Sequence, residues 1–389
     1  MSNTAKKQNQ TSPESYNPKR PEILSLAGEY GKTTSIEELQ RYVDSNGEPP
    51  KSSNKIEGIR RLWHDDDSEN SYFEGCCAAT MKAIGASQEY NYMFFNIVCG
   101  GLFTQTYNSS TSAGFSGVFN PCLVEHVFDL CGYSYLYIDQ QMIGQHYDLV
   151  MNTIKTAIDK GIPVMTAGVG NVQLNDKFID TLYEWSTIGG YDENDILYVN
   201  IYCRDIVTDK NGYCTIEGGL KKSKGLYIIG EKYQDISISD CIKRSILSIP
   251  IFISLPPLDA VSFGQQAYYD WADGLLDEKN MDRIETDPYQ GFLWEGHHAP
   301  WIVALTNECH LRIEYDHIIQ QCSDFSVSGK VKEIYTIIYE DLPMIQKLHG
   351  GEFFATIDVI KKLEVRKELA TVLRKMGDLH NKLFELFEK

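Results

Sequence analysis

The pattern of hydrophobic and polar residues changes near residue 260. Before that point, short apolar runs bounded by turn-forming residues predict β-strands at 133–138, 162–169, 184–202 (two antiparallel strands joined by a turn at 192–195), 213–216 and 225–229. One amphipathic helix is predicted among them at 147–160. After that point, apolar residues repeat about every four positions, which predicts helices from near residues 263, 301, 331 and 365. The pattern indicates an α+β part followed by an all-helical part.

The first 55 residues are predicted to form a flexible arm with one short helix. Residues 1–20 are polar and poor in groups that could form a core. Ser35 and Glu38 have the spacing of a helical capping box, and residues 46–50 then interrupt the helix. The arm could serve in regulation or in packing. After it, we expect domains at 56–258 and 259–389.

The stretch from Ser71 to Gly85 combines two adjacent cysteines with a helix-forming run. Gly85 occupies the position where a left-handed glycine would end the helix. This places Cys76 and Cys77 on the first helical turn, where the helix dipole favours a thiolate and lowers the thiol pKa. Two interpretations are open at this point: a nucleophile, or an ordinary buried cysteine.

Composition narrows the classes of partner. The net charge is −18 at pH 7, which argues against nucleic acid or an anionic membrane as the main partner. No apolar run reaches the length of a membrane span, and the N-terminus lacks the apolar segment of a secretion signal. The 10 cysteines show no C-x-x-C spacing, so we expect free thiols in a cytoplasmic protein and neither metal nor cofactor.

Three features occur in a recognisable order: a cysteine at a helix start, a helix followed by Gly161-Ile162-Pro163-Val164, and a hairpin whose first strand ends in Ile188-Gly189-Gly190-Tyr191-Asp192. This set resembles the C39-like, papain-fold family that includes the N-terminal domain of the butirosin-biosynthesis H protein. The helical part from Ser262 resembles the extension that often follows that domain. The resemblance covers residues 56–389. It implies a papain-like fold, with the cysteine helix packed on an antiparallel sheet and a site between them.

The resemblance also implies site residues. Cys76 matches the nucleophile, with Cys77 as the alternative, and Asn70 holds the position of the amide that binds the oxyanion. Asn200 matches the third member of the triad. The position of the catalytic histidine is occupied by Glu184, and a carboxylate there disfavours the thiolate instead of stabilising it. A base from elsewhere would have to be His126, His146, His297 or His298.

The sequence therefore predicts a papain-like fold with a departed catalytic triad. The first hypothesis is a cleft that binds a small amine, an amino acid or a peptide; its predicted ligand-binding residues are Glu184, Trp185, Tyr191, Asp192 and Cys77, with Tyr92 as a further wall. The second is a thiol-dependent acyltransferase or amide-processing enzyme of specialised metabolism using Cys76, for which an acyl carrier protein would be a partner. The third is a structural or interaction protein, including a homodimer joined through the C-terminal helices.

Overall fold

The computed structural model describes residues 31–62, 72–99, 105–109, 113–115, 121–169, 171–174, 177–180, 185–201, 208–255, 257, 260–286, 329–330, 332–333, 359 and 361–387. These residues belong to two compact units. The first, which we call the sheet unit, comprises residues 30–95 and 117–236. The second, the helix-pair unit, contains residues 96–116 and 237–389. Residues 117–236 of the sheet unit are therefore inserted between the two parts of the helix-pair unit.

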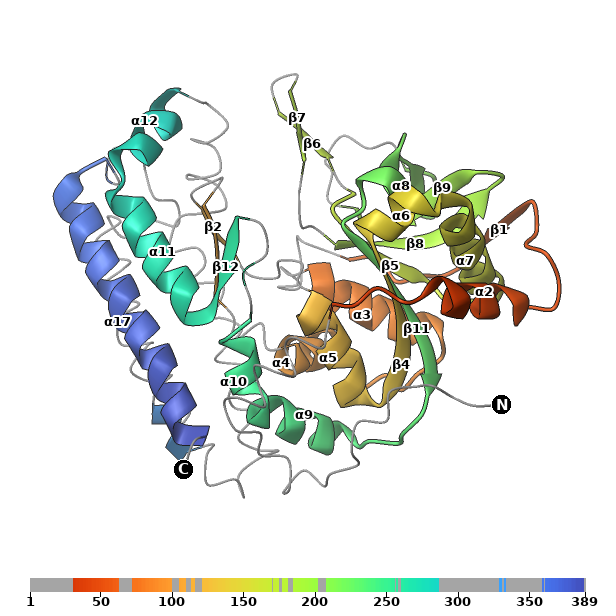
Figure 1. Cartoon of the computed structure of the whole chain (residues 1–389), viewed down its shortest axis with the longest axis horizontal. Coiled ribbons are helices and arrows are strands. Elements are labelled where there is room, and N and C mark those ends of the chain that lie inside the picture. Colours follow the sequence, from red (N-terminus) through yellow and green to blue (C-terminus); the bar gives the residue numbers. More distant parts are fainter. Residues whose placement is uncertain are drawn as a thin grey trace. The chain divides into compact units, whose positions relative to one another are not determined.

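The sheet unit combines an antiparallel sheet with several helices (Figure 1). Its helices are α2 (Ile36–Asp44), α3 (Tyr72–Ala83), α5 (Pro121–Cys131), α6 (Gln140–Gln145), α7 (Tyr147–Asp159) and α8 (Gly219–Lys222). Its strands are β1 (Ser53–Lys55), β4 (Tyr133–Asp139), β5 (Val164–Ala167), β8 (Trp185–Asp192), β9 (Asp195–Val199), β10 (Cys214–Thr215) and β11 (Gly225–Lys232). A separate two-stranded pair is formed by β6 (Asn171–Leu174) and β7 (Lys177–Asp180), and α4 (Tyr92–Val98) crosses the boundary between the units.

The strand order in the main sheet is β10-β9-β8-β5-β11-β4, and β1 also pairs with β8. All of these pairings are antiparallel. The first half of β8 pairs with β5, whereas its last three residues pair with β1. The predicted hairpin within 184–202 is confirmed as β8 and β9, and the other predicted strands are confirmed as β4, β5, β10 and β11. The mixed α+β class predicted from the sequence is correct.

The sheet is buried on both faces. Along β11, Leu226 and Ile228 join the hydrophobic core that contains Ile154 of α7. Tyr227 lies between them in sequence and therefore points to the opposite face, where its ring centroid is 6.1 Å from that of Trp185. The ring of Phe73 on α3 packs against that of Trp185, so α3 lies on this second face. The cysteine-bearing helix and α7 thus cover opposite faces of the sheet.

Residues 31–55 pack on the sheet unit, which differs from the flexible arm expected for this part of the sequence. The helix α2 begins at the predicted capping box and lies alongside α7 (Figure 1). Leu39 of α2 is fully buried in the core. The N–H of Thr34 donates a hydrogen bond to the carbonyl of Tyr137 at 2.7 Å, which covers the edge strand β4. Local polarity did not indicate this packing because its partners lie about a hundred residues away.

The helix-pair unit contains α9 (Ile238–Leu247), α10 (Ile249–Phe252), α11 (Gly264–Leu276), α12 (Glu278–Thr286) and α17 (Leu363–Phe387). It also contains a small antiparallel sheet of β2 (Thr106–Asn108), β3 (Ala113–Phe115) and β12 (Val261–Phe263), in the order β12-β2-β3. The helices predicted from near residues 263 and 365 are confirmed as α11 and α17. Those predicted near 301 and 331 lie largely outside the described residues.

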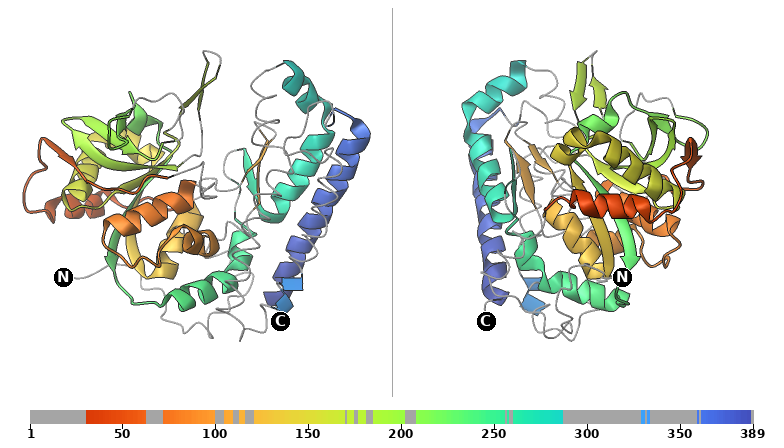
Figure 2. Two further views of the ribbon diagram at one scale, coloured as in Figure 1. Left: turned by 180° about the vertical axis from the view of Figure 1, so that it is seen from behind. Right: turned by 45° about the vertical axis from the view of Figure 1, so that its right-hand side comes forward.

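α11 and α17 run side by side in opposite directions (Figure 1, Figure 2). Near the start of α17, the Arg366 guanidinium donates to the Leu275 carbonyl at 3.0 Å and to Glu278 at 2.9 Å. Further along, the hydroxyl of Tyr269 donates to Asp378 at 2.5 Å. Polar contacts therefore join the two helices at Arg366 and at Asp378, and an ion pair between Arg374 and Asp273 lies between these points.

The prediction of an all-helical C-terminal part needs one correction. Residues 261–263 form β12, whose partner β2 lies at 106–108. A three-residue strand is too short to show a period of two, and its partner is distant in the sequence, so the local pattern could not predict it. Among the described residues, no helix is both long and apolar enough to cross a membrane.

Candidate functional site around the cysteine helix

The helix α3 begins earlier than the sequence indicated. It starts at Tyr72, so Cys76 and Cys77 lie in its second turn and Gly75 lies inside the helix. A Cβ atom at Gly75 would lie 2.5 Å from Cδ2 of Leu62, so the glycine serves close packing and does not end a loop. The dipole acts within the first turn. The predicted position of the thiols in the first turn is therefore wrong, and the lowered thiol pKa expected from it loses its basis.

Both thiols of α3 are buried. Cys76 is 0% and Cys77 is 1% exposed. Burial raises the pKa of Cys77 well above its ordinary value, and the nearby Glu74 carboxylate and Cys76 raise it further. A protonated thiol is a poor nucleophile. At neutral pH, Cys77 therefore carries its proton.

Trp185 lies between α3 and the sheet. Its ring centroid is 4.9 Å from that of Phe73 on α3 and 6.1 Å from that of Tyr227 on β11. Its exposed fraction is 1%. Trp185 was predicted as a wall of the ligand cleft, but in the structure it packs the cysteine helix onto β8.

A segment that the sequence did not single out lies against α3. We call residues 53–62 the strap: it begins as β1 and ends at Leu62, which packs against Gly75. Asn200, the predicted third member of the triad, holds the far end of this strap. Its Oδ1 accepts from the N–H of Leu62 and its Nδ2 donates to the carbonyl of Arg60, both at 3.0 Å. The Asn200 amide therefore positions backbone, and these two bonds use the groups that would orient a catalytic base.

Glycines of β8 and α3 leave room for the strap. A Cβ atom at Gly189 would lie 2.5 Å from Cδ1 of Ile59, and one at Gly190 would lie 2.9 Å from the carbonyl oxygen of Asn54. With Gly75, these glycines form the surface on which the strap is seated. The Gly189-Gly190 pair was the one signal in the sequence that could have indicated close approach of another segment.

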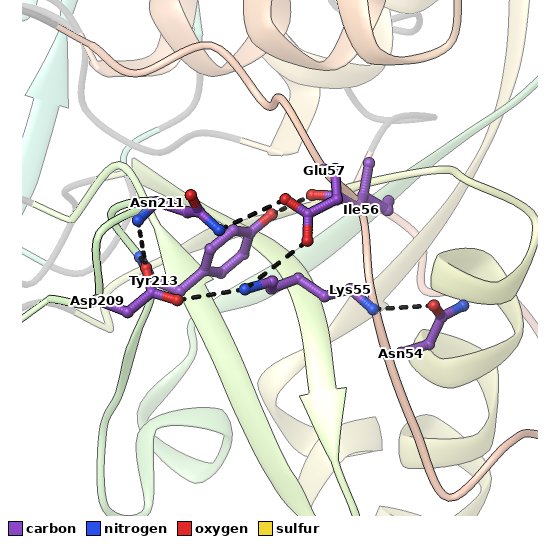
Figure 3. A network of polar contacts seen from close by, with 7 residues as sticks. All are labelled: Asn54, Lys55, Ile56, Glu57, Asp209, Asn211 and Tyr213. Atoms are coloured by element: carbon purple, nitrogen blue, oxygen red, sulfur yellow. Dashed lines mark hydrogen bonds and ion pairs between the residues drawn. The ribbon is translucent and has the colours of Figure 1, made fainter.

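The base of the strap is fastened by the polar network shown in Figure 3. The Lys55 ammonium lies 3.2 Å from the Asp209 carboxylate and 4.9 Å from the ring centroid of Tyr213. The Tyr213 hydroxyl donates to the carbonyl of Ile56 at 2.5 Å. Backbone N–H groups of Tyr213 and Asn211, together with Lys55, lower the pKa of Asp209. The network ties β1 to the segment before β10.

Two other predicted ligand residues lie at the end of β8. Tyr191 is buried, and its hydroxyl donates to Asp159 of α7 at 2.8 Å. It therefore joins β8 to α7. Asp192 is exposed at the hairpin turn, where Glu193 and Asp195 are exposed as well. These three carboxylates form a local concentration of negative charge.

The structure describes only some of the remaining predicted residues. Asn70, Glu184, His297 and His298 lie outside the described residues. His126 is buried on α5, and burial lowers its pKa to about 3, far below that of a useful base for a thiol. His146 lies between α6 and α7. Tyr92 is buried on α4.

Among the described residues, no three side chains of His, Cys, Asp or Glu lie close enough together to hold a metal ion. The described cysteines (Cys76, Cys77, Cys99, Cys131, Cys214 and Cys241) are all buried. No protein-family model matches the chain, and no curated protein matches it at a significant level.

Proposed function

We propose that the chain has a papain-like fold with a departed catalytic triad and that it binds a small amine, an amino acid or a peptide without cleaving it. The observation that carries this proposal is the burial of Cys76 and Cys77 in the second turn of α3. A thiol used for hydrolysis needs both access to substrate and a base that holds its proton. Two fully buried thiols favour a binding role over turnover.

The neighbours of the thiols support the same conclusion. The pKa of Cys77 is raised, so its reactive form is rare near neutral pH. The amide of Asn200 is bound to the backbone of the strap. His126, with a pKa lowered to about 3, is a weak proton acceptor. Glu184 stands where the resemblance would require the histidine.

The class of ligand follows from charge. The chain carries a net charge of −18, and Asp192, Glu193 and Asp195 are all exposed at the β8–β9 turn. Negative potential raises the local concentration of cations. An amine or a basic peptide is therefore the ligand class that this surface would attract.

The test is a thermal-shift titration of the full chain with putrescine, lysine and a dilysine peptide. We expect at least one probe to raise the melting temperature of the wild type and of Cys76→Ala equally, because the thiol takes no part in binding. Asp192→Asn should weaken the shift, whereas Glu217→Gln, an exposed carboxylate elsewhere in the sheet unit, should not. Equal shifts with sodium chloride at matched ionic strength, or no shift with any probe, would overturn the proposal.

A second measurement separates binding from catalysis. Intact-mass analysis after incubation with an activated acyl thioester or a peptide ester should show no acyl adduct on Cys76. An acyl-enzyme that is absent in Cys76→Ala would replace the proposal with the thiol-dependent acyltransferase, for which an acyl carrier protein is the expected partner.

A further inference from the structure

The two halves of the strap are held differently. The first half is β1, which pairs with the last residues of β8 and is fastened by the network of Lys55, Asp209 and Tyr213 (Figure 3). The second half, residues 59–62, leaves the sheet and reaches α3. Ile59 is the only residue of the strap with less than a tenth of its surface exposed. Segments with little buried apolar surface open at a lower cost than the whole unit unfolds.

Gly58 separates these halves. Its φ angle is +75°, and a Cβ atom there would meet nothing within 4 Å. This left-handed conformation suits glycine, and the open surroundings leave the backbone free to change. Gly58 therefore has the properties of a hinge between β1, which the polar network holds on the sheet, and residues 59–62, which bury little apolar surface.

The end of the strap covers one face of α3. Leu62 packs on Gly75, and Ile59 belongs to a cluster with Ala79, against which Ala83 also packs. Cys76 precedes Ala79 by three residues and Ala83 by seven, so it shares this side of the helix. Cys77 is one residue further, rotated by about 100°, toward Phe73 and the sheet.

We propose that residues 59–62 are a latch that swings about Gly58, with Asn200 as its catch, and that its opening exposes Cys76 while Cys77 stays buried. The catch consists of the two hydrogen bonds of the Asn200 amide to Arg60 and Leu62. This device is independent of the proposed function, because its readout is the accessibility of a thiol and not the binding of a ligand.

The test uses iodoacetamide on the folded full chain, with Cys76 and Cys77 resolved by peptide mass spectrometry. Asn200→Gly removes the amide but keeps a residue suited to the φ of +62° at this position. We expect the alkylation rate of Cys76 to rise about 5- to 150-fold, the change in opening that two ordinary hydrogen bonds represent. The rate at Cys77 should stay unchanged.

The matched control is Glu193→Gly. Glu193 also has a positive φ, +51°, and lies on the exposed hairpin turn, so this variant makes the same kind of substitution away from the catch. Asn200→Asp provides a second variant, since it keeps the acceptor for the Leu62 N–H but places a carboxylate oxygen against the Arg60 carbonyl; it should also raise the rate at Cys76. An unchanged Cys76 rate in both Asn200 variants, or equal rises at Cys76 and Cys77, would overturn the proposal.

Discussion

Replacing Gly189 by alanine tests directly whether the strap is seated on β8. The added methyl group would lie 2.5 Å from Cδ1 of Ile59 and 2.6 Å from the hydroxyl oxygen of Tyr213. Carbon atoms in ordinary contact are about 3.5–4.0 Å apart, so Cδ1 of Ile59 must move by about 1 Å, and the Tyr213 hydroxyl must move as well. The Tyr213 hydroxyl resists because it donates to the carbonyl of Ile56 at 2.5 Å. Overpacking of this kind costs about 1–3 kcal/mol.

For a unit of this size, 1 kcal/mol corresponds to about 2–4 °C in melting temperature. We therefore expect Gly189→Ala to melt about 2–12 °C below the wild type in scans by circular dichroism at one heating rate. The control is Gly144→Ala in α6, where a Cβ atom meets nothing within 4 Å; it should be neutral or stabilising by up to about 1 kcal/mol. Gly189→Ala melting with the wild type would refute the seating of the strap.

Three further predictions follow from buried polar groups. Arg366→Ala removes a guanidinium that is 3% exposed and bonded to two partners, and should lower the free energy of unfolding by about 2–4 kcal/mol in urea titrations; Arg374→Ala, at an exposed ion pair, should cost no more than about 1 kcal/mol. The pKa of His126 falls from 6.5 to about 3 on folding, so between these pH values only the unfolded chain binds this proton. The free energy of unfolding should therefore drop by about 1.4 kcal/mol per pH unit on acidification, and His126→Gln should reduce that slope. Because the pKa of Cys77 is raised, only the unfolded chain loses this proton above pH ~8.5, so stability should fall with rising pH there, and less steeply in Cys77→Ala.

The elements that could be predicted from the sequence are those whose own residues show a regular hydrophobic repeat. The helices α7, α11 and α17 each have an apolar face several turns long, and the β8–β9 hairpin has its turn residues between two apolar runs. The start of α3 was misplaced because Gly75 has a low helix propensity. Its reason for being there, the contact with Leu62, is a tertiary one that the local sequence does not contain.

The candidate site was harder to predict than the fold. The resemblance selected Asn200, and the structure gives this residue a defined role, but its partners are backbone groups of Arg60 and Leu62. A hydrogen bond to a backbone group does not depend on which side chain the partner carries, so the sequence does not indicate it. Trp185 and Tyr191 were assigned to a ligand cleft because aromatic residues commonly line one. In the structure they are 1% and 0% exposed, and both pack within the sheet unit.

The insertion of residues 117–236 between the two parts of the helix-pair unit bears on the order of folding during synthesis. The hydrogen bond between Ser109 and Ala260 in the small sheet joins residues 151 positions apart. Ribosomes add about 5–20 residues per second, so β2 and β3 wait roughly 8–30 s before β12 emerges to pair with them. All strands of the main sheet are complete by Lys232. The sheet unit can therefore fold on the ribosome first, before β12 is available to complete the small sheet with β2 and β3.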